Sequence, residues 1–132
     1  MNIHLTGKWL PALLIAIGFH PPAGAQSYPA KTVRIIVPFP AGAGADTTTR
    51  LFTPRLAEEL GQQFIVDNRA GAAGNVGAES AARAAPDGYT LLVAPASLAS
   101  SRSLYKKLNF DLVRDFAPIT MLAASPRPSC RP

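Results

Sequence analysis

TVRIIVPFPAGAGAD, residues 32–46, is the stretch of sequence that decides the fold. Its first part, Thr32–Val37, is rich in β-branched residues and almost uninterrupted in hydrophobicity, which predicts a strand buried on both faces. Pro38 ends this strand, and a loop of glycine, alanine and proline then leads to Asp46, which we expect to cap a helix. Such a loop presents free backbone N–H groups at the carboxyl end of a strand, where an anion can bind.

A second loop of the same composition, NRAGAAGN at residues 68–75, follows about one βα unit later. Around the two loops the patterns predict helices over 47–60, ending at Gly61, and over 75–85, with further strands over 64–66 and 89–93. This alternation predicts an α/β fold with a parallel sheet and right-handed crossovers. Loops that follow parallel strands share one edge of the sheet, so we expect the two glycine loops and the segment after residue 93 to meet there.

The remaining segments predict shorter features. Pro54 lies inside the first helix and should kink it, and Pro86-Asp87-Gly88 is a turn. Residues 95–103 are rich in serine and are expected to form a polar loop. After them we expect one helical turn over 104–108 and the start of a fourth strand over 116–122.

The N-terminus has the organisation of an export signal. Lys8 supplies a positive charge, Trp9–Phe19 is apolar, and Ala23-Gly24-Ala25 fits a cleavage site. The apolar run is too short to cross a bilayer as a helix, which argues against a membrane anchor. We therefore expect residues 1–25 to be a signal peptide cleaved after Ala25, and the protein to act in a bacterial periplasm.

Composition excludes several classes of function. The net charge is +5, but the basic residues are scattered and not interleaved with aromatic ones, so nucleic-acid binding is not expected. Both histidines, His4 and His20, lie in the predicted signal peptide, which excludes histidine-assisted nucleophiles and argues against a zinc site. The single cysteine, Cys130, lies in a proline-rich tail at 125–132 that we expect to be disordered. The sequence thus favours binding over catalysis, with no cofactor and no metal.

Each polar residue near the glycine loops has a structural and a functional interpretation. The first loop either binds a carboxylate or phosphate or is a tight turn that binds nothing, and it lacks the residues of a nucleotide-binding motif. Asp46 and Asn75 are either helix caps or ligand contacts. Arg69 either pairs with a ligand carboxylate or is solvated, and Ser97, Ser100 and Ser101 offer hydroxyl donors.

Several segments together resemble the substrate-binding proteins of tripartite tricarboxylate transporters, the TctC or Bug family of periplasmic receptors. The most specific are N-R-x-G-x-x-G-N-x-G-A-E at residues 68–79 and P-D-G-Y-T-L-L at residues 86–92. Others are Tyr28-Pro29, the block 33–46, Arg50-Leu51, Leu60-Gly61-Gln62, Ser103-Leu104-Tyr105 and residues 115–119. The resemblance covers roughly residues 28–124.

The resemblance implies a periplasmic-binding-protein-like, Venus flytrap α/β domain. Such a receptor captures a small carboxylated solute, a di- or tricarboxylate or an amino acid, and delivers it to a membrane permease without enzyme chemistry. It implies that loop 39–45, with Asp46 behind it, holds the ligand carboxylate, and that loop 94–101 supplies the other side. The expected ligand-binding residues are Phe39, Pro40, Ala41, Gly42, Ala43, Gly44, Asp46, Asn75, Ala94, Ser97 and Ser101.

The chain departs from the family pattern in three respects. It has Gly42-Ala43 where the family usually has paired glycines, and Ser101-Arg102 where an Asn-Pro pair is typical. Family members run to about three hundred residues, so we interpret residues 26–124 as the N-terminal part of the first domain and 125–132 as a non-family tail of a truncated, incomplete receptor. The alternatives are a small α/β enzyme or nucleotide-binding domain that uses loop 42–46, or a non-functional fragment.

Overall fold

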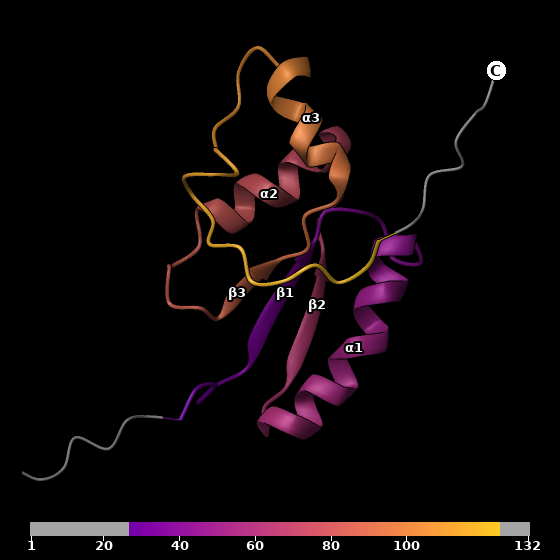
Figure 1. Cartoon of the computed structure of the whole chain (residues 1–132), viewed down its shortest axis with the longest axis vertical. Helices are drawn as coiled ribbons and strands as arrows, with labels where there is room; N and C mark the ends of the chain where they lie inside the picture. The colour runs from indigo at the N-terminus through magenta and orange to yellow at the C-terminus, as the bar shows by residue number, and fades with distance from the viewer. Residues whose placement is uncertain (1–26, 125–132) are drawn as a thin grey trace, which may run out of the picture.

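The structure is a computed structural model of the whole chain, and it describes residues 27–124 (Figure 1). Within them, three strands and three α-helices follow one another along the chain, with one 3₁₀ turn, η1, before the second helix. The bounds are β1 Val33–Val37, α1 Gly44–Leu60, β2 Phe64–Asn68, η1 Ala72–Gly74, α2 Asn75–Ala82, β3 Thr90–Leu92 and α3 Ala96–Leu104. The predicted signal peptide and the tail 125–132 lie outside the described residues. None of the described helices is long and apolar enough to span a bilayer.

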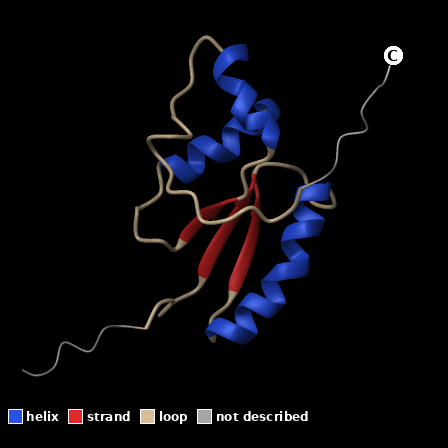
Figure 2. Cartoon of the chain, in the orientation of Figure 1, coloured by secondary structure: helices blue, strands red, loops and turns tan. Residues whose placement is uncertain are grey.

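The three strands form one sheet in the order β2-β1-β3, and both pairings are parallel. Ile35 lies between Val66 on one side and Leu91 on the other, which fixes the register of the sheet. The predicted parallel α/β arrangement is therefore confirmed. Each strand is followed by a helix, so the starts of all three helices lie toward the carboxyl edge of the sheet (Figure 2).

The central strand β1 carries most of the apolar core of the sheet. Val33, Ile35 and Val37 face one side, and each is buried. Ile36 is buried on the other side, next to the exposed Arg34. Helix α1 packs on β2 and β1, whereas α2 packs on β3 and β1 (Figure 1). The nearly continuous hydrophobicity of this strand therefore reflects burial on both faces, as predicted.

Helix α1 ends where the sequence predicts. Gly61 adopts the left-handed conformation, with φ 66°, and its N–H donates to the carbonyl of Ala57. Pro54 lies inside the helix and cannot donate to the carbonyl of Arg50, four residues earlier. The hydroxyl of Thr53 donates to that carbonyl instead, at 3.4 Å, so the carbonyl keeps a partner.

A second apolar cluster joins α2, α3 and the segment that follows α3. Its buried members are Ala78, Leu98 and Phe110, and the half-buried Leu92, Leu108, Leu112 and Phe116 pack against them. Residues 105–124 after α3 contain no helix or strand. Their large apolar residues anchor this irregular segment to α2 and α3.

Several boundaries differ from the sequence prediction. Helix α2 ends at Ala82 rather than residue 85, β2 extends to Asn68, and β3 is confined to Thr90–Leu92. The serine-rich segment expected as a loop is α3, and the expected turn over 104–108 and strand over 116–122 are absent from the described residues. Serine disfavours helix interiors only weakly, and here Leu98 and Ser101 are buried on one helical face. Phe116 packs on the second cluster, and residues 116–122 pair with none of the three described strands.

Candidate functional site

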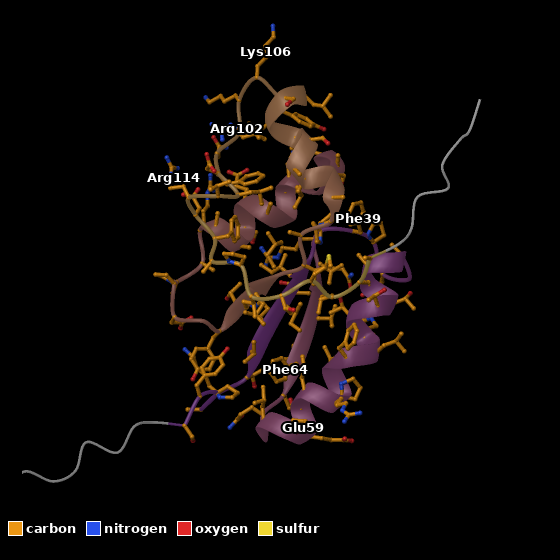
Figure 3. All side chains as sticks on the ribbon, viewed as in Figure 1. Phe39, Glu59, Phe64, Arg102, Lys106 and Arg114 are labelled. Atoms are coloured by element: carbon orange, nitrogen blue, oxygen red, sulfur yellow. The ribbon has the colours of Figure 1, made fainter. Side chains whose placement is uncertain are left out.

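The loop after β1 turns sharply and folds back onto the start of α1. Gly42 has φ 84°, a conformation that favours glycine, and its N–H donates to the Asp46 carboxylate at 2.8 Å. The N–H of Ala43 donates to the carbonyl of Pro40 at 3.2 Å. Ala43 has φ −68° and ψ 158°, which any residue adopts, so the alanine that replaces the usual second glycine fits without backbone strain. Figure 3 shows Phe39 of this loop at the opposite end of the sheet from Phe64.

Asp46 is not the helix cap that the sequence predicts. Ala43 holds the cap position, so Asp46 is the third residue of α1 and its carboxylate reaches back to the Gly42 N–H. Asp46 is only 2% exposed, and it also accepts hydrogen bonds from the side chains of Arg50 and Asn68. These donors, Arg50 first, then the Gly42 N–H and Asn68, lower the pKa of Asp46 to about 2. The carboxylate is therefore charged throughout the physiological range.

Arg50 and Asn68 complete this arrangement, and neither was predicted as a site residue. The Arg50 Nε lies 2.9 and 3.0 Å from the two carboxylate oxygens of Asp46. The Asn68 Nδ2 donates to Asp46 and to the carbonyl of Phe39, at 3.0 and 3.1 Å. A basic residue four positions after an acidic one on a helix was the available signal for Arg50. Asn68 pairs in register with Val37, and only the sheet brings it to the loop.

The second glycine loop, 69–74, is held in a conformation that few residues adopt. Gly71, Ala72, Ala73 and Gly74 all have positive φ values, and left-handed alanine costs about 1–2 kcal/mol per residue. A methyl group on Gly74 would lie 3.3 Å from the Leu98 side chain and 3.4 Å from Pro38. The loop thus packs the start of α2 closely on the end of β1 and on α3, as expected of a shared edge.

The structure places Asn75 and Arg69 differently from the simplest sequence predictions, in which Asn75 caps a helix and Arg69 is solvated. Gly74 holds the cap position of α2, and Asn75 is the first helical residue, 7% exposed. Neither the amide nitrogen nor the amide oxygen of Asn75 has a hydrogen-bond partner among the described residues. Arg69 is engaged within the fold, because it donates to the Asp67 carboxylate at 2.9 Å and to the Ser80 hydroxyl. Asn75 is therefore the polar group at this edge that most lacks a partner.

The segment after β3 presents a helix start rather than a polar loop. Ala94 and Ser97 are exposed, whereas Ser101 is 1% exposed and its hydroxyl donates to the carbonyl of Ser97 at 3.4 Å. Pro95 holds the cap position of α3 and has no side-chain hydrogen bond to the helix. The first turn of α3 thus contributes backbone amides and Ser97 to the edge, while Ser101 packs inside.

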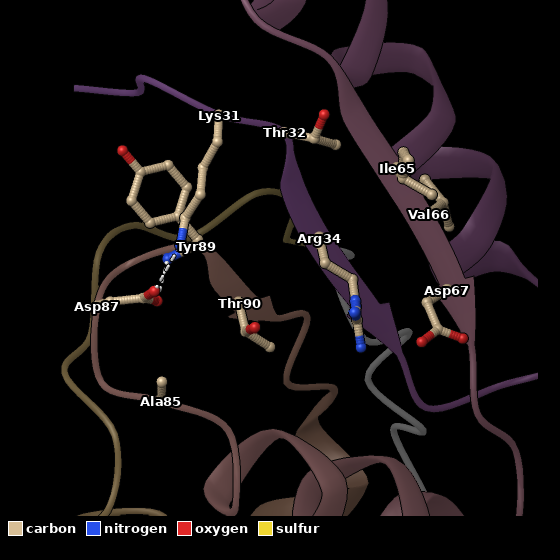
Figure 4. A pocket seen from close by; sticks show the side chains of 10 residues that line it. All are labelled: Lys31, Thr32, Arg34, Ile65, Val66, Asp67, Ala85, Asp87, Tyr89 and Thr90. Atoms are coloured by element: carbon tan, nitrogen blue, oxygen red, sulfur yellow. Dashed lines mark hydrogen bonds and ion pairs between the residues drawn. The ribbon is translucent and has the colours of Figure 1, made fainter. Parts of the chain in front are cut away.

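A separate open hollow lies on the face of the sheet that carries Arg34 (Figure 4). It encloses about 580 Å³, and its lining carries both charges, with Lys31 and Arg34 opposite Asp67 and Asp87. Lys31 pairs with Asp87 at 3.0 Å and lies 4.3 Å from the centre of the Tyr89 ring. None of the predicted site residues lines this hollow. Within residues 27–124, no group of three or more acidic, cysteine or histidine side chains is placed to hold a metal ion.

Comparison with known proteins points to one class of receptor. The model of the tripartite tricarboxylate transporter family receptor matches residues 48–129. BugT of Bordetella pertussis is 39% identical over 111 residues, which make up 83% of this chain and 34% of BugT. MatC from Rhodopseudomonas palustris, solved with bound malate, is similar with a TM-score of 0.68 at 38% identity, over 72% of this chain and 33% of MatC. A second R. palustris protein, solved with adipate, gives a TM-score of 0.62 at 34% identity, over 65% of this chain and 29% of that protein. The chain spans about a third of the length of the curated relatives it matches.

Proposed function

Because this chain belongs to the tripartite tricarboxylate transporter receptor family, we propose that it forms one wall of a site for a small dicarboxylate. The family is one of solute-binding receptors, and we extend to this chain the absence of enzyme activity. Two similar structures hold malate and adipate, which are both dicarboxylates, and this supports the ligand class. We further propose that residues 1–25 direct export to the periplasm with cleavage after Ala25, and that the captured solute passes to a membrane permease.

One observation carries the proposed carboxylate site. The helices α1, α2 and α3 all begin on the carboxyl side of the sheet, and none has a side-chain hydrogen bond at its cap position. The first amides of an α-helix have no partner within the helix, and the helix start carries a partial positive charge. A carboxylate supplies the acceptors and the negative charge that such an edge lacks.

The amides of Gly44, Ala45 and Asp46 are the donors we assign to the ligand. They open the longest of the three helices and follow directly on the exposed loop 40–42. The other predicted residues at this edge surround them: Phe39, Pro40, Ala41, Gly42 and Ala43 on the first loop, Ala94 and Ser97 before and within α3. Asn75 and Ser101 are buried, so we assign them a supporting place behind the ligand.

Titration calorimetry of the purified chain with adipate and malate tests the ligand class. We expect both dicarboxylates to bind and a nucleotide such as ADP not to bind. The proposal is overturned if neither dicarboxylate binds to folded protein, or if ADP binds and the dicarboxylates do not.

A pair of variants at Gly44 tests the amide donors. Proline is well tolerated at the first position of a helix, and Ala43 before it has the extended backbone that a following proline requires. Gly44→Pro therefore deletes one amide donor and leaves α1 intact. Gly44→Ala keeps the amide, and no atom lies within 4 Å of the added methyl group. We expect Gly44→Pro to weaken adipate binding about tenfold or more relative to Gly44→Ala. Equal affinities of the two variants would remove α1 from the site.

A further inference from the structure

Asp46 creates an electrostatic problem for the proposed site. Its carboxylate lies in the first turn of α1, beside the amides assigned to the ligand. A full negative charge there exceeds the partial positive charge of the helix start, which is equivalent to about half an elementary charge. An unpaired Asp46 would therefore repel an anionic ligand, and its low pKa keeps it charged at every physiological pH.

Arg50 is placed to solve this problem. Its Nε donates to both carboxylate oxygens of Asp46, at 2.9 and 3.0 Å, and its Nη2 donates to the Asn68 side-chain oxygen at 3.1 Å. The Arg50 side chain is 52% exposed, so the guanidinium stands between the buried carboxylate and solvent. The Asp46 side chain is only 3% exposed, so Arg50 stabilises the fold by pairing a buried charge. Because the guanidinium is half-exposed, its charge also acts on an anion at the start of α1.

We propose that Arg50 is a specificity-determining residue that cancels the charge of Asp46 and so keeps the start of α1 attractive to doubly charged ligands. The inference rests on the proposed function, because it concerns the same carboxylate site. Asn68 is its positioning partner, since it binds Asp46, the Arg50 guanidinium and the Phe39 carbonyl together. Arg50 itself need not touch the ligand.

The charge of the ligand supplies the readout. Adipate and hexanoate have chains of the same length, but adipate carries two negative charges and hexanoate one. A general structural defect weakens both ligands, whereas a change in the potential at the site acts more strongly on the dianion. The ratio of the two dissociation constants therefore separates an electrostatic role from a structural one.

The test measures both dissociation constants by calorimetry at pH 7.5 and low salt for the wild type and four variants. Arg50→Gln should weaken adipate binding about tenfold and hexanoate about threefold, and the loss should shrink at high salt. Asp46→Asn should shift the ratio in the opposite direction. The double variant Asp46→Asn/Arg50→Gln should return the ratio to within about twofold of wild type. Arg55→Gln removes the same charge from an exposed site on the same helix, where Arg55 pairs with Glu59, and should leave the ratio unchanged.

The outcomes separate the two proposals. If the wild type binds neither adipate nor hexanoate, the carboxylate site and the role of Arg50 both fall. If the wild type binds adipate but Arg50→Gln and Arg55→Gln give the same ratio, only the role of Arg50 falls. Should Arg50→Gln not fold, Asp46→Asn decides alone: a ratio equal to that of wild type overturns the inference.

Discussion

Gly77→Ala should destabilise the protein because α2 approaches the end of β1 with no room for a methyl group. A Cβ at this position would lie 2.8 Å from the Cβ of Pro38 and 2.9 Å from its Cα. It would also lie 2.9 Å from the carbonyl oxygen of Arg69. Two of these three contacts are with backbone atoms, so no side chain can rotate to relieve them. The start of α2 must move away from the sheet edge.

The expected loss of folding stability in Gly77→Ala follows from two opposing effects. Overpacking of this kind costs about 1–3 kcal/mol, while replacing glycine by alanine inside a helix gains about 0.5–1 kcal/mol. With the middle of each range, the net loss is about 1 kcal/mol, which for a domain of this size lowers Tm by about 4–8 °C. Gly44→Ala is the matched control, because its methyl group meets no atom within 4 Å. It should leave Tm unchanged or raise it by a few degrees.

Thermal unfolding followed by far-ultraviolet circular dichroism, with urea unfolding as a second measure, distinguishes the two variants. The reasoning is refuted if Gly77→Ala melts at or above the wild-type temperature, because the close approach of α2 and Pro38 would then not exist. Equal losses in Gly77→Ala and Gly44→Ala would also refute it, since the second site has open space.

Three further predictions concern other parts of the fold. Asp46→Asn should lower the free energy of unfolding above about pH 5, and its difference from wild type should shrink as pH falls toward 2. The reason is that a carboxylate with a lowered pKa in the folded state stabilises the fold only where it is ionised. Urea unfolding that gives the same difference across this pH range would contradict the lowered pKa. Leu98→Ala should lower the free energy of unfolding in urea by about 2–5 kcal/mol, because Leu98 is only 1% exposed. Leu104 is 74% exposed, so Leu104→Ala should change it by less than about 0.5 kcal/mol. Similar losses in the two variants would contradict the second apolar cluster. Ala73→Gly should raise the free energy of unfolding by up to about 1 kcal/mol, because glycine adopts the φ of 56° without strain. The greater flexibility of glycine in the unfolded chain offsets part of this gain. A marked loss of stability would show that the second loop is not left-handed in solution.

The sequence predicted the central architecture because its signals there are local and strong. The β-branched run before Pro38 indicates an extended strand, and Gly61 and the two glycine loops mark where the helices and strands end. The parallel sheet is confirmed by the register of β1 with its two neighbours, and the family resemblance by the match over residues 48–129. The predicted site residues themselves remain a prediction, and the calorimetric experiments test them.

The errors fall where tertiary contacts outweigh local preference. The serine-rich segment forms α3 because Leu98 packs against the start of α2, and composition gives no sign of that contact. Residues 116–122 have the composition of a strand, but they pair with none of the described strands, and Phe116 packs on the second apolar cluster instead. Neither outcome follows from the residues of the segment itself.

Asp46 shows why a site residue can be found in the sequence and still be given the wrong place. Both a cap and a third helical residue satisfy backbone amides near a helix start, so the pattern around Gly42 and Gly44 fits either. The two placements of Asp46 differ by three helical residues, and this shift decides which backbone amides at the start of α1 remain free. With Asp46 inside the first turn, its carboxylate takes the Gly42 N–H and leaves the amides of residues 44–46 for a ligand. A negative charge in that position is compatible with an anion site only if a cation follows at the right distance, and Arg50, one helical turn later, is that cation.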